Sequence, residues 1–451
     1  MTMPVPGITG RPDTEVVFDP ATYVDGVPFG ALTRLRRDRP VAWVEEIPVL
    51  GWPEGPGFWL VLRHADVEEV LNRPKLFSSS LGATQIRDPA TPEALRYVRK
   101  MMLNMDPPEH SRLRRMLSRS FTPRAVAGLE DRIRQHARTI CDRVLGQAAG
   151  GECDFAKDLA ADLPLLTLAD VLGVPAEDRW LLFDWSNRVI GYQDPDYATS
   201  AEFDPGIGTE MAAEALRLRP APDPVTGRMP DPRTREGMPD LYAYAHLLAE
   251  HKRRHPGDDV MSILLAQRDE TGGGRVSTEE FENMFWLFAV AGNETLRNGL
   301  PGGCIALLEN PGAAGEIRAD PGLLDTAVDE MLRWWTPVMT FRRTATADCA
   351  IGGQAIRAGD KVVVSFISAN RDEGVFADPE KFDIRRQPNP HLVFGHGPHF
   401  CLGAHLARTQ MRALFGEILA RTSSLTYAGQ PSYLRSNFQR GVKRLPVAFS
   451  R

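Results

Sequence analysis

Apolar residues recur at helical spacing along most of this chain. The pattern predicts helices over four long segments, residues 121–146, 241–254, 277–298 and 323–335. Ser277 is followed three residues later by Glu280, which is the spacing of a capping box, so we expect the third of these helices to begin there. That helix is long and unusually apolar, and we expect it to run through the core.

Runs with strand character are short and few. They cover residues 41–44, 58–62 and 350–366, with glycines in position to form turns. The expected fold class is therefore mainly α with small peripheral β-sheets. No internal repeat and no Gly/Ser linker separates parts of the chain, so we predict one domain over residues 20–451 after a disordered leader of residues 1–19.

A proline-rich stretch, residues 203–240, interrupts the helical pattern. Its second half holds prolines at positions 220, 222, 224, 230, 232 and 239. These forbid a continuous helix or a central strand there, so we expect a long surface excursion. Loops of this length are usually functional or disordered. A lid and a tolerated insertion both stay open as interpretations.

Composition narrows the class of protein. Hydrophobic residues make up 43% of the chain and charged residues 25%, which is the balance of a globular protein with a sizeable core. The formal net charge of -6 gives no general attraction to nucleic acid or to anionic lipid, so we expect neither partner. The chain has no apolar run of membrane-spanning length and no signal-peptide pattern, so we predict no membrane insertion and a cytoplasmic location.

The five cysteines include one with unusual neighbours. Their number is odd and they form no C-x-x-C pair, which favours neither a disulfide framework nor a zinc site. Cys401 lies in the sequence FGHGPHFCLG, residues 394–403, directly before a run with a helical pattern. Backbone N–H groups at a helix start favour the thiolate, which is the form that binds metal. The glycines let the backbone approach a large flat ligand, whereas a cysteine without them is usually structural.

The whole of residues 394–403 resembles the haem-binding signature of the cytochrome P450 family. The resemblance extends from about residue 20 to the C-terminus. It implies the cytochrome P450 fold and makes Cys401 the thiolate ligand of haem iron, where thiolate ligation favours O–O cleavage. The chain has no C-x-x-C-H motif, so we expect the haem to be held non-covalently, as haem b.

Residues 291–295, AGNET, place a glycine, an acid and a hydroxyl inside the predicted core helix. Each is costly or at best neutral in such a position. The segment resembles the A-G-x-(D/E)-T segment of the family, which implies that Glu294 relays protons and that Thr295 delivers them to bound dioxygen. The alternative for Thr295 is a hydrogen bond back to a carbonyl one turn earlier.

Haem carries two propionates, which need cations. The sequence DPPEHSRLR, residues 106–114, resembles a helix of the family that binds them, which implies this role for His110 and Arg114. Arg343 and His399 match the remaining family positions. The alternative for each of these residues is a solvated or capping side chain.

Glu330 and Arg333 are spaced so that they can pair on one helix face. Spacing alone makes a solvated surface pair the default interpretation. The position of this pair upstream of Cys401 is similar to that of the E-x-x-R helix of the family, which implies a structural role beside the haem.

The chain contains no G-x-G-x-x-G, P-loop or other nicotinamide- or flavin-binding motif. The resemblance therefore implies that electrons arrive from a separate ferredoxin or flavodoxin with an NAD(P)H-dependent reductase. Four arginines cluster in a segment without acids, at Arg112, Arg115, Arg119 and Arg124. We interpret the cluster either as a docking site for an acidic donor or as a solvated face.

The activity implied by the resemblance is that of an oxidoreductase, which inserts one oxygen atom from O₂ into an apolar small molecule. Residues 291–298, 341–346 and 434–438 resemble bacterial members that oxidise steroids, terpenoids or branched lipids. Candidates for an apolar pocket are Phe288, Ala291, Val338, Met339 and Phe438. The alternatives are a tailoring oxidase acting on a polyketide or peptide, a peroxide-driven haem-thiolate enzyme and a non-catalytic haem sensor.

Overall fold

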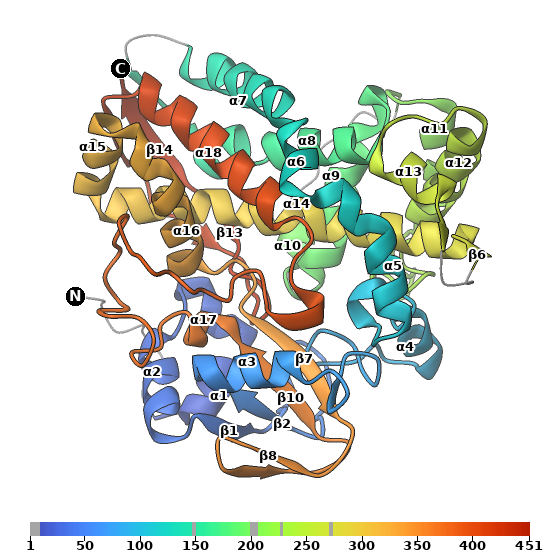
Figure 1. Ribbon diagram of the computed structural model, residues 1–451, viewed down its shortest axis with the longest axis vertical. Helices are drawn as coiled ribbons and strands as arrows, with labels where there is room; N and C mark the ends of the chain where they lie inside the picture. Colours follow the sequence, from blue (N-terminus) through green and yellow to red (C-terminus); the bar gives the residue numbers. More distant parts are fainter. Residues whose placement is uncertain (1–9, 147–149, 199–205, 226–228, 270–273) are drawn as a thin grey trace. The chain divides into compact units, whose positions relative to one another are not determined.

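The chain divides into two compact units. The first comprises Met1–Arg87, Ile133–Asp162 and Thr295–Arg451, and the second comprises Asp88–Arg132 and Leu163–Glu294. Figure 1 shows the computed structural model, which describes residues 10–146, 150–198, 206–225, 229–269 and 274–451. The expected fold class, mainly α with small sheets, is confirmed. The prediction of a single domain stays a prediction.

A five-stranded sheet forms the largest β-structure of the first unit. In spatial order its strands are β1 (Val41–Val44), β2 (Phe58–Val61), β10 (Lys361–Ser365), β7 (Thr340–Ala345) and β3 (Phe77–Ser78). β10 pairs with β2 in parallel and with β7 antiparallel, so segments far apart in the chain become neighbours. The pattern of the sequence predicts β1, β2 and β10 but neither β7 nor β3.

Both faces of this sheet are covered, because successive side chains of a strand point to opposite faces. Val363 packs in one apolar cluster with α1 (Asp13–Phe18) and α2 (Phe29–Asp38). Val362 and Val364 pack in another with α3 (His64–Asn72). Full burial of a valine stabilises the folded state by about 1.5–3 kcal/mol, so the alternation holds the helices on both sides of the sheet.

α1 lies within the stretch that composition predicts to be a disordered leader. Residues 1–9 of that leader lie outside the described residues. Asp13–Phe18 form a helix in which Val16 is 0% exposed and Phe18 is 2% exposed. The structure differs from the prediction here because these side chains are buried against the sheet, which composition does not reveal.

Helices and smaller sheets complete the first unit. The helices are α7 (Glu130–Leu145), α15 (Pro311–Ala319), α16 (Leu324–Trp335), α17 (Phe366–Ala369) and α18 (Ala404–Arg421). A three-stranded sheet joins β11 (Ser424–Tyr427), β14 (Pro446–Ser450) and β4 (Gly150–Asp154). Two strand pairs join β8 (Cys349–Ile351) to β9 (Gln354–Ile356) and β12 (Ser432–Tyr433) to β13 (Val442–Arg444). The helix predicted over residues 323–335 is confirmed as α16.

The second unit is built mainly from helices. They are α4 (Pro92–Val98), α5 (Glu109–Ser118), α6 (Pro123–Ala127), α8 (Asp162–Leu172), α9 (Arg179–Ile190), α10 (Pro195–Ala198), α11 (Glu210–Leu216), α12 (Pro239–Arg254) and α13 (Val260–Ala266). β5 (Arg268–Asp269) and β6 (Gly274–Arg275) form a short antiparallel pair. The prediction over residues 241–254 is confirmed as α12, whereas that over residues 121–146 is divided between α6 and α7. Among the described residues, no helix is both long enough and apolar enough to cross a membrane.

The longest helix is α14 (Thr278–Glu309), with 32 residues. Its predicted capping box is confirmed, because Ser277 N donates to Glu280 Oε2 at 2.9 Å and Glu280 N donates to Ser277 Oγ at 3.1 Å. The predicted end at residue 298 is wrong. The helix continues through Pro301 and two glycines, whose missing side chains leave room for the rings of Trp335 and Phe415.

Several hydrogen bonds tie the proline-rich excursion to other parts of the second unit. α11 lies in its first half, and the described residues from 217 to 238 contain neither helix nor strand, as the prolines predict. Among them are Thr209 Oγ1 to Asp178 at 2.7 Å, Arg219 to Asp184 at 2.6 Å and Arg235 to Glu282 at 2.9 Å. These bonds anchor the excursion near both ends of its described part.

Candidate active site around Cys401

Two glycines shape the loop that carries Cys401. Gly395 and Gly397 have φ angles of 70° and 68°, in the left-handed region that favours glycine. A Cβ at position 397 would lie 2.5 Å from the carbonyl oxygen of Leu71, at the end of α3. Cys401 N donates to Phe394 O at 2.9 Å and closes the loop. The glycines therefore let the loop turn tightly against α3 and present Cys401 at its end.

The sulfur of Cys401 lies at the start of α18. Gly403 caps this 18-residue helix, and a Cβ there would lie 3.9 Å from the Sγ of Cys401. Cys401 is exposed, whereas the other four cysteines are buried or half-buried. An accessible sulfur before a helix N-terminus fits a thiolate ligand, because the helix dipole favours negative charge there.

The other cysteines are poor candidates for a thiolate. Burial raises the pKa of Cys141 and of Cys153 to about 12. Burial also raises the pKa of Cys304 well above its ordinary value. These thiols stay protonated near neutral pH, and a protonated thiol is not a metal ligand.

Arg343 and His399, two of the predicted propionate ligands, lie close to one strand of the first unit. Arg343 is on β7 and is 4% exposed. On β3, Ser78 pairs with Thr344, the neighbour of Arg343. The next residue, Ser79, has its Oγ 3.2 Å from Nε2 of His399. The structure thus places His399 beside the edge strand β3, which pairs with the strand that carries Arg343.

His110 and Arg114, the other predicted propionate ligands, belong to the second unit. Both lie on α5, one turn apart. His110 is 1% exposed and Arg114 is half-buried. An imidazole buried to this extent is not the solvated side chain of the alternative interpretation. The assignment of both residues to the propionates stays a prediction.

Within the segment 291–295, exposed residues interrupt the otherwise mostly buried helix α14. Ala291 and Gly292 are exposed, although Asn293 and Glu294 are 0% exposed. A Cβ at position 292 would lie 2.9 Å from a methyl group of Leu168 on α8, so a side chain there would displace the end of that leucine. Thr295 is half-buried and lies one turn after Ala291, on the same face of the helix.

Glu294 is held by two hydroxyls that the sequence does not point to. Tyr197 Oη donates to Oε1 of Glu294. Ser186 Oγ donates to Oε2 at 3.3 Å. Ser186 lies on α9 and Tyr197 on α10, and no motif of the chain links either residue to Glu294. Only the folded structure reveals them.

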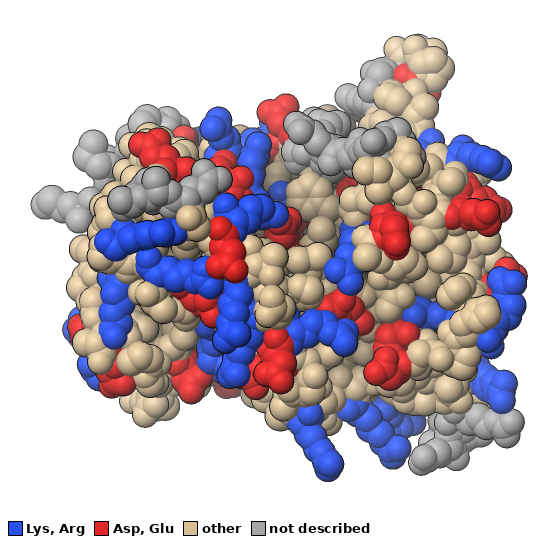
Figure 2. Space-filling model, turned by 90° about the horizontal axis from the view of Figure 1, so that it is seen from above, with Lys and Arg blue, Asp and Glu red and all other residues tan. Residues whose placement is uncertain are grey.

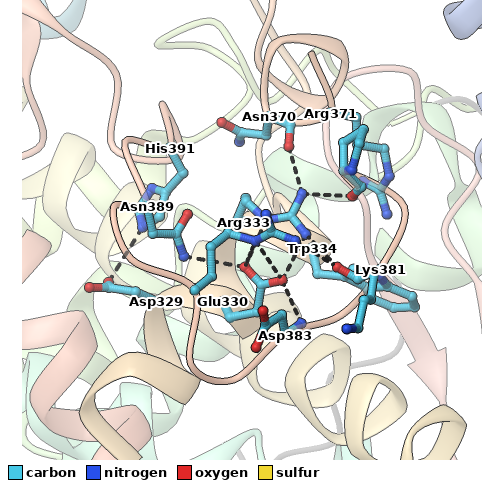
Figure 3. Close-up of polar contacts among 12 residues, drawn as sticks. Asp329, Glu330, Arg333, Trp334, Asn370, Arg371, Lys381, Asp383, Asn389 and His391 are labelled. Atoms are coloured by element: carbon cyan, nitrogen blue, oxygen red, sulfur yellow. Dashed lines mark hydrogen bonds and ion pairs between the residues drawn. The ribbon is translucent and has the colours of Figure 1, made fainter. Parts of the chain in front are cut away.

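The pair Glu330–Arg333 is fully buried, which corrects the default expectation of a solvated pair. Arg333 Nε donates to Oε2 of Glu330 at 2.7 Å, and both side chains are 0% exposed. Figure 3 shows the guanidinium of Arg333 between this carboxylate and backbone oxygens, including that of Asn370 at 2.8 Å. Asp383 N donates to Glu330 Oε1 at 2.9 Å. α16 is thereby fastened to the loop that precedes Cys401.

Comparisons with known proteins agree with this geometry. The family model described as Cytochrome P450 matches residues 244–432. The steroid C26-monooxygenase of Mycolicibacterium smegmatis is 37% identical over 451 residues, covering 99% of this chain and 96% of the relative. The methyl-branched lipid omega-hydroxylase of Mycobacterium tuberculosis is 38% identical over 428 residues, covering 94% and 92%.

Solved structures show the same likeness. A cytochrome P450 of Mycobacterium marinum in complex with pseudoionone matches with a TM-score of 0.79 and 38% identity, covering 93% of this chain and 94% of that one. This chain therefore belongs to the cytochrome P450 family. It is a monooxygenase of that family, whose members are haem-thiolate enzymes.

The residues present fit a haem. The exposed Cys401 directly precedes a helix N-terminus, where a thiolate is favoured, and Gly395 and Gly397 allow the tight turn that presents it. The family motifs also supply arginine and histidine side chains, which suit carboxylates. Bound haem supplies the activation of dioxygen.

Proposed function

We propose that this chain hydroxylates a steroid, a terpenoid or a branched lipid, with Cys401 as the ligand of haem b. The observation that carries the proposal is the exposed Cys401 at the end of its glycine loop. Two relatives are named for oxidation at C26 of a steroid and at the omega position of a methyl-branched lipid. The second name gives the omega position of a methyl-branched lipid, so we propose a terminal carbon as the site of hydroxylation.

In this proposal four cationic residues bind the propionates. Arg343 and His399 belong to the first unit, and His110 and Arg114 belong to the second. Arginine pairs with a carboxylate through two parallel N–H donors, whereas the contribution of histidine depends on its protonation. The support for these roles is the burial of His110 and Arg343 and the match of all four positions to the family.

The proposed roles of Glu294 and Thr295 concern protons. Thr295 lies on the face of α14 that carries the exposed Ala291 and Gly292, where its hydroxyl can donate to a bound ligand. In this proposal Glu294 relays protons from solvent toward Thr295, its neighbour on α14. Positioned proton transfer of this kind typically contributes about 10²–10⁴-fold to a rate.

The proposed substrate contacts are apolar. Phe288 and Ala291 lie on α14, and Val338 and Phe438 lie in the first unit, where Phe438 stacks on Phe341 with the ring centroids 6.0 Å apart. The prediction that Met339 lines the pocket is dropped, because Met339 is 1% exposed and packs in the core on one face of the sheet.

We propose that electrons arrive from a ferredoxin or flavodoxin with an NAD(P)H-dependent reductase. Figure 2 shows acidic and basic side chains interspersed over one face of the molecule, so a local cluster is a better docking candidate than overall charge. Arg115, Arg119 and Arg124 are exposed. Arg112 is withdrawn from the docking cluster because it forms an ion pair with Glu280.

One set of experiments tests the proposal. The reduced carbon monoxide complex of the wild type should show a red-shifted Soret band, which Cys401→Ser should abolish and the control Cys349→Ser should retain. Steroids, terpenoids and branched lipids are then screened for a substrate-induced spin-state change. Product formation is measured in two reactions, one with NAD(P)H, the electron donor and the reductase, and the other with peroxide alone. The oxidised carbon of the product is then identified.

Two outcomes would contradict the proposal. A red-shifted band that persists in Cys401→Ser would remove Cys401 from the iron. A spin-state change limited to polyketides or cyclic peptides would replace the substrate class with that of a tailoring oxidase.

A further inference from the structure

We infer that Tyr197 and Ser186 are positioning residues, which hold the carboxylate of Glu294 for proton delivery. The inference rests on the proposed function, in which Glu294 passes protons toward Thr295. It deepens that function by naming the side chains that set the acid in place.

Hydroxyl donors meet both oxygens of the Glu294 carboxylate. Tyr197 donates to Oε1 and Ser186 donates to Oε2. Glu294 and Ser186 are 0% exposed and Tyr197 is 4% exposed, so bulk water does not compete for these bonds. Burial of a carboxylate is unfavourable unless hydrogen bonds replace its water. The two hydroxyls provide such bonds from a direction that the fold determines.

A close backbone contact brings the two hydroxyls to the same carboxylate. Ser186 lies on α9 and Tyr197 on α10, and Gly191 begins the turn between these helices. A Cβ at position 191 would lie 2.5 Å from the nitrogen of Ala198 and 2.6 Å from its Cα. Tyr197 N donates to Asp194 O at 3.0 Å within this turn. Only glycine at position 191 lets α10 fold back closely enough to place Tyr197 beside Glu294.

The two hydroxyls decide where the carboxylate points. Glu294 is about 100° around α14 from Thr295, because successive residues of a helix are offset by that angle. The exposed face of the helix carries Ala291 and Gly292, whereas the Glu294 carboxylate is bonded toward α9 and α10. A glutamate side chain has several rotatable bonds, and the hydroxyl bonds select one conformation. Without them the acid would spend less time in the position from which it passes protons.

Hydroxyls suit an acid that gains and loses a proton. Each hydroxyl can donate to an ionised carboxylate, and after rotation of its O–H bond it can accept from a protonated one. Both protonation states of Glu294 therefore keep a partner. A guanidinium in the same place would donate only and would favour the ionised state.

The test compares Tyr197→Phe, Ser186→Ala and Ser186→Thr in the holoenzyme with the wild type. Tyr244→Phe is the matched control, because Tyr244 also donates from a buried hydroxyl to a buried carboxylate, that of Asp178, at 2.7 Å. Four quantities are measured: the coupling of NAD(P)H oxidation to product, the solvent isotope effect on turnover, the substrate-induced spin-state titration and the infrared carboxyl band that is lost in Glu294→Gln.

We expect Tyr197→Phe to lower coupling about tenfold and Ser186→Ala to lower it about threefold, less than the about 10²–10⁴-fold of a proton donor itself, because both residues act through Glu294. Both should raise the solvent isotope effect and shift the Glu294 infrared band, while the spin-state titration stays unchanged. Ser186→Thr keeps a hydroxyl and should restore the coupling and the band. Tyr244→Phe should leave both at their wild-type values, even if it lowers the melting temperature.

The outcomes separate this inference from the proposed function. If Glu294→Gln loses coupling but Tyr197→Phe and Ser186→Ala keep the wild-type coupling and infrared band, the positioning role is overturned and the role of Glu294 stands. If Glu294→Gln itself keeps full coupling and the normal isotope effect, the proposed role of Glu294 fails, and the positioning role fails with it.

Discussion

Two buried glutamates of this protein occupy contrasting sites. Glu330 and Glu294 are both 0% exposed. Glu330 accepts two hydrogen bonds from the guanidinium of Arg333, at 2.7 and 2.8 Å. Glu294 accepts hydrogen bonds from the hydroxyls of Tyr197 and Ser186. Burial is common to both acids, whereas their donors differ. A guanidinium can only donate and a hydroxyl can also accept, so we expect Glu294 and not Glu330 to exchange protons.

The energetic consequences of the two sites differ as well. Removal of one partner of a buried ion pair leaves an uncompensated charge and typically costs about 3–5 kcal/mol. A hydrogen bond from a hydroxyl contributes about 0.5–1.5 kcal/mol net. Substitutions at Glu330 should therefore act mainly on stability, and substitutions at Glu294 mainly on turnover.

The largest effect should come from Arg333→Ala. This change removes the shorter of two guanidinium contacts of Glu330, the other being to Arg386 at 3.2 Å, and it takes the donor away from the buried carbonyl oxygen of Asn370. The free energy of unfolding should therefore fall by about 3–5 kcal/mol. Unfolding in denaturant measures this free energy. Arg385→Ala is the control, because the Arg385–Glu316 pair is more than half exposed and should be worth at most about 1 kcal/mol. Equal losses in the two variants would contradict the contrast between a buried and a surface pair.

The same substitution at both glutamates sharpens the comparison. Glu294→Gln should lower the coupling of NAD(P)H oxidation to product by about 10²-fold, because an amide cannot relay protons. Its unfolding free energy should change by no more than about 1.5 kcal/mol. Glu330→Gln should show the reverse, with a marked loss of stability and normal coupling in the protein that stays folded. Coupling lost equally in both variants would argue against distinct roles.

Two glycines of α14 allow the contribution of packing near α16, the helix of Glu330, to be measured without a change of charge. A Cβ at position 302 would overlap the ring of Trp335, so Gly302→Ala should lower the unfolding free energy by about 1–3 kcal/mol. A Cβ at position 299 would lie 3.4 Å from Pro337, close to an ordinary contact. Gly299→Ala should therefore be neutral or slightly stabilising, because alanine favours a helix. Thermal unfolding compares the two, and a destabilised Gly299→Ala beside a neutral Gly302→Ala would refute the packing argument.

The smallest effect should be a pH dependence at Asp329, the neighbour of Glu330. Burial acts to raise the pKa of Asp329, but hydrogen bonds and charge from His391 and Arg408 outweigh it, so the pKa is lowered overall. A lowered pKa in the folded state adds stability above the unfolded pKa, and this stability is lost as the pH falls through the folded pKa. Asp329→Asn should therefore melt at a lower temperature than the wild type near neutral pH, and the difference should shrink toward acid pH. A difference that stays constant with pH would exclude this origin.

The sequence predicts the local features of the site well. The capping box of Ser277 and Glu280 needs only residues three apart, and the structure confirms both of its hydrogen bonds. The turn before Cys401 needs glycines at positive φ, and Gly395 and Gly397 adopt it. Helical periodicity likewise predicts α12, α16 and the start of α14, because each pattern repeats within the element itself.

Features that depend on contacts between distant segments could not be predicted from the sequence. Spacing predicts a solvated Glu330–Arg333 pair by default, yet the loop around Asp383 encloses it. The helical pattern predicts an end at residue 298, yet α14 continues to Glu309, and the rings of Trp335 and Phe415 pack into the space that Gly302 and Gly303 leave.

The sequence by itself determined the family, the cysteine loop and most of the long helices, because their signals lie in residue types at short spacing. Only the tertiary structure decided which side chains surround the two buried glutamates. Tyr197 and Ser186, which donate to Glu294, lie 97 and 108 positions before it in the sequence. The physical reason is that the path of the backbone determines which side chains lie next to a buried polar group. Here that path depends on the close approach of Gly191 to Ala198.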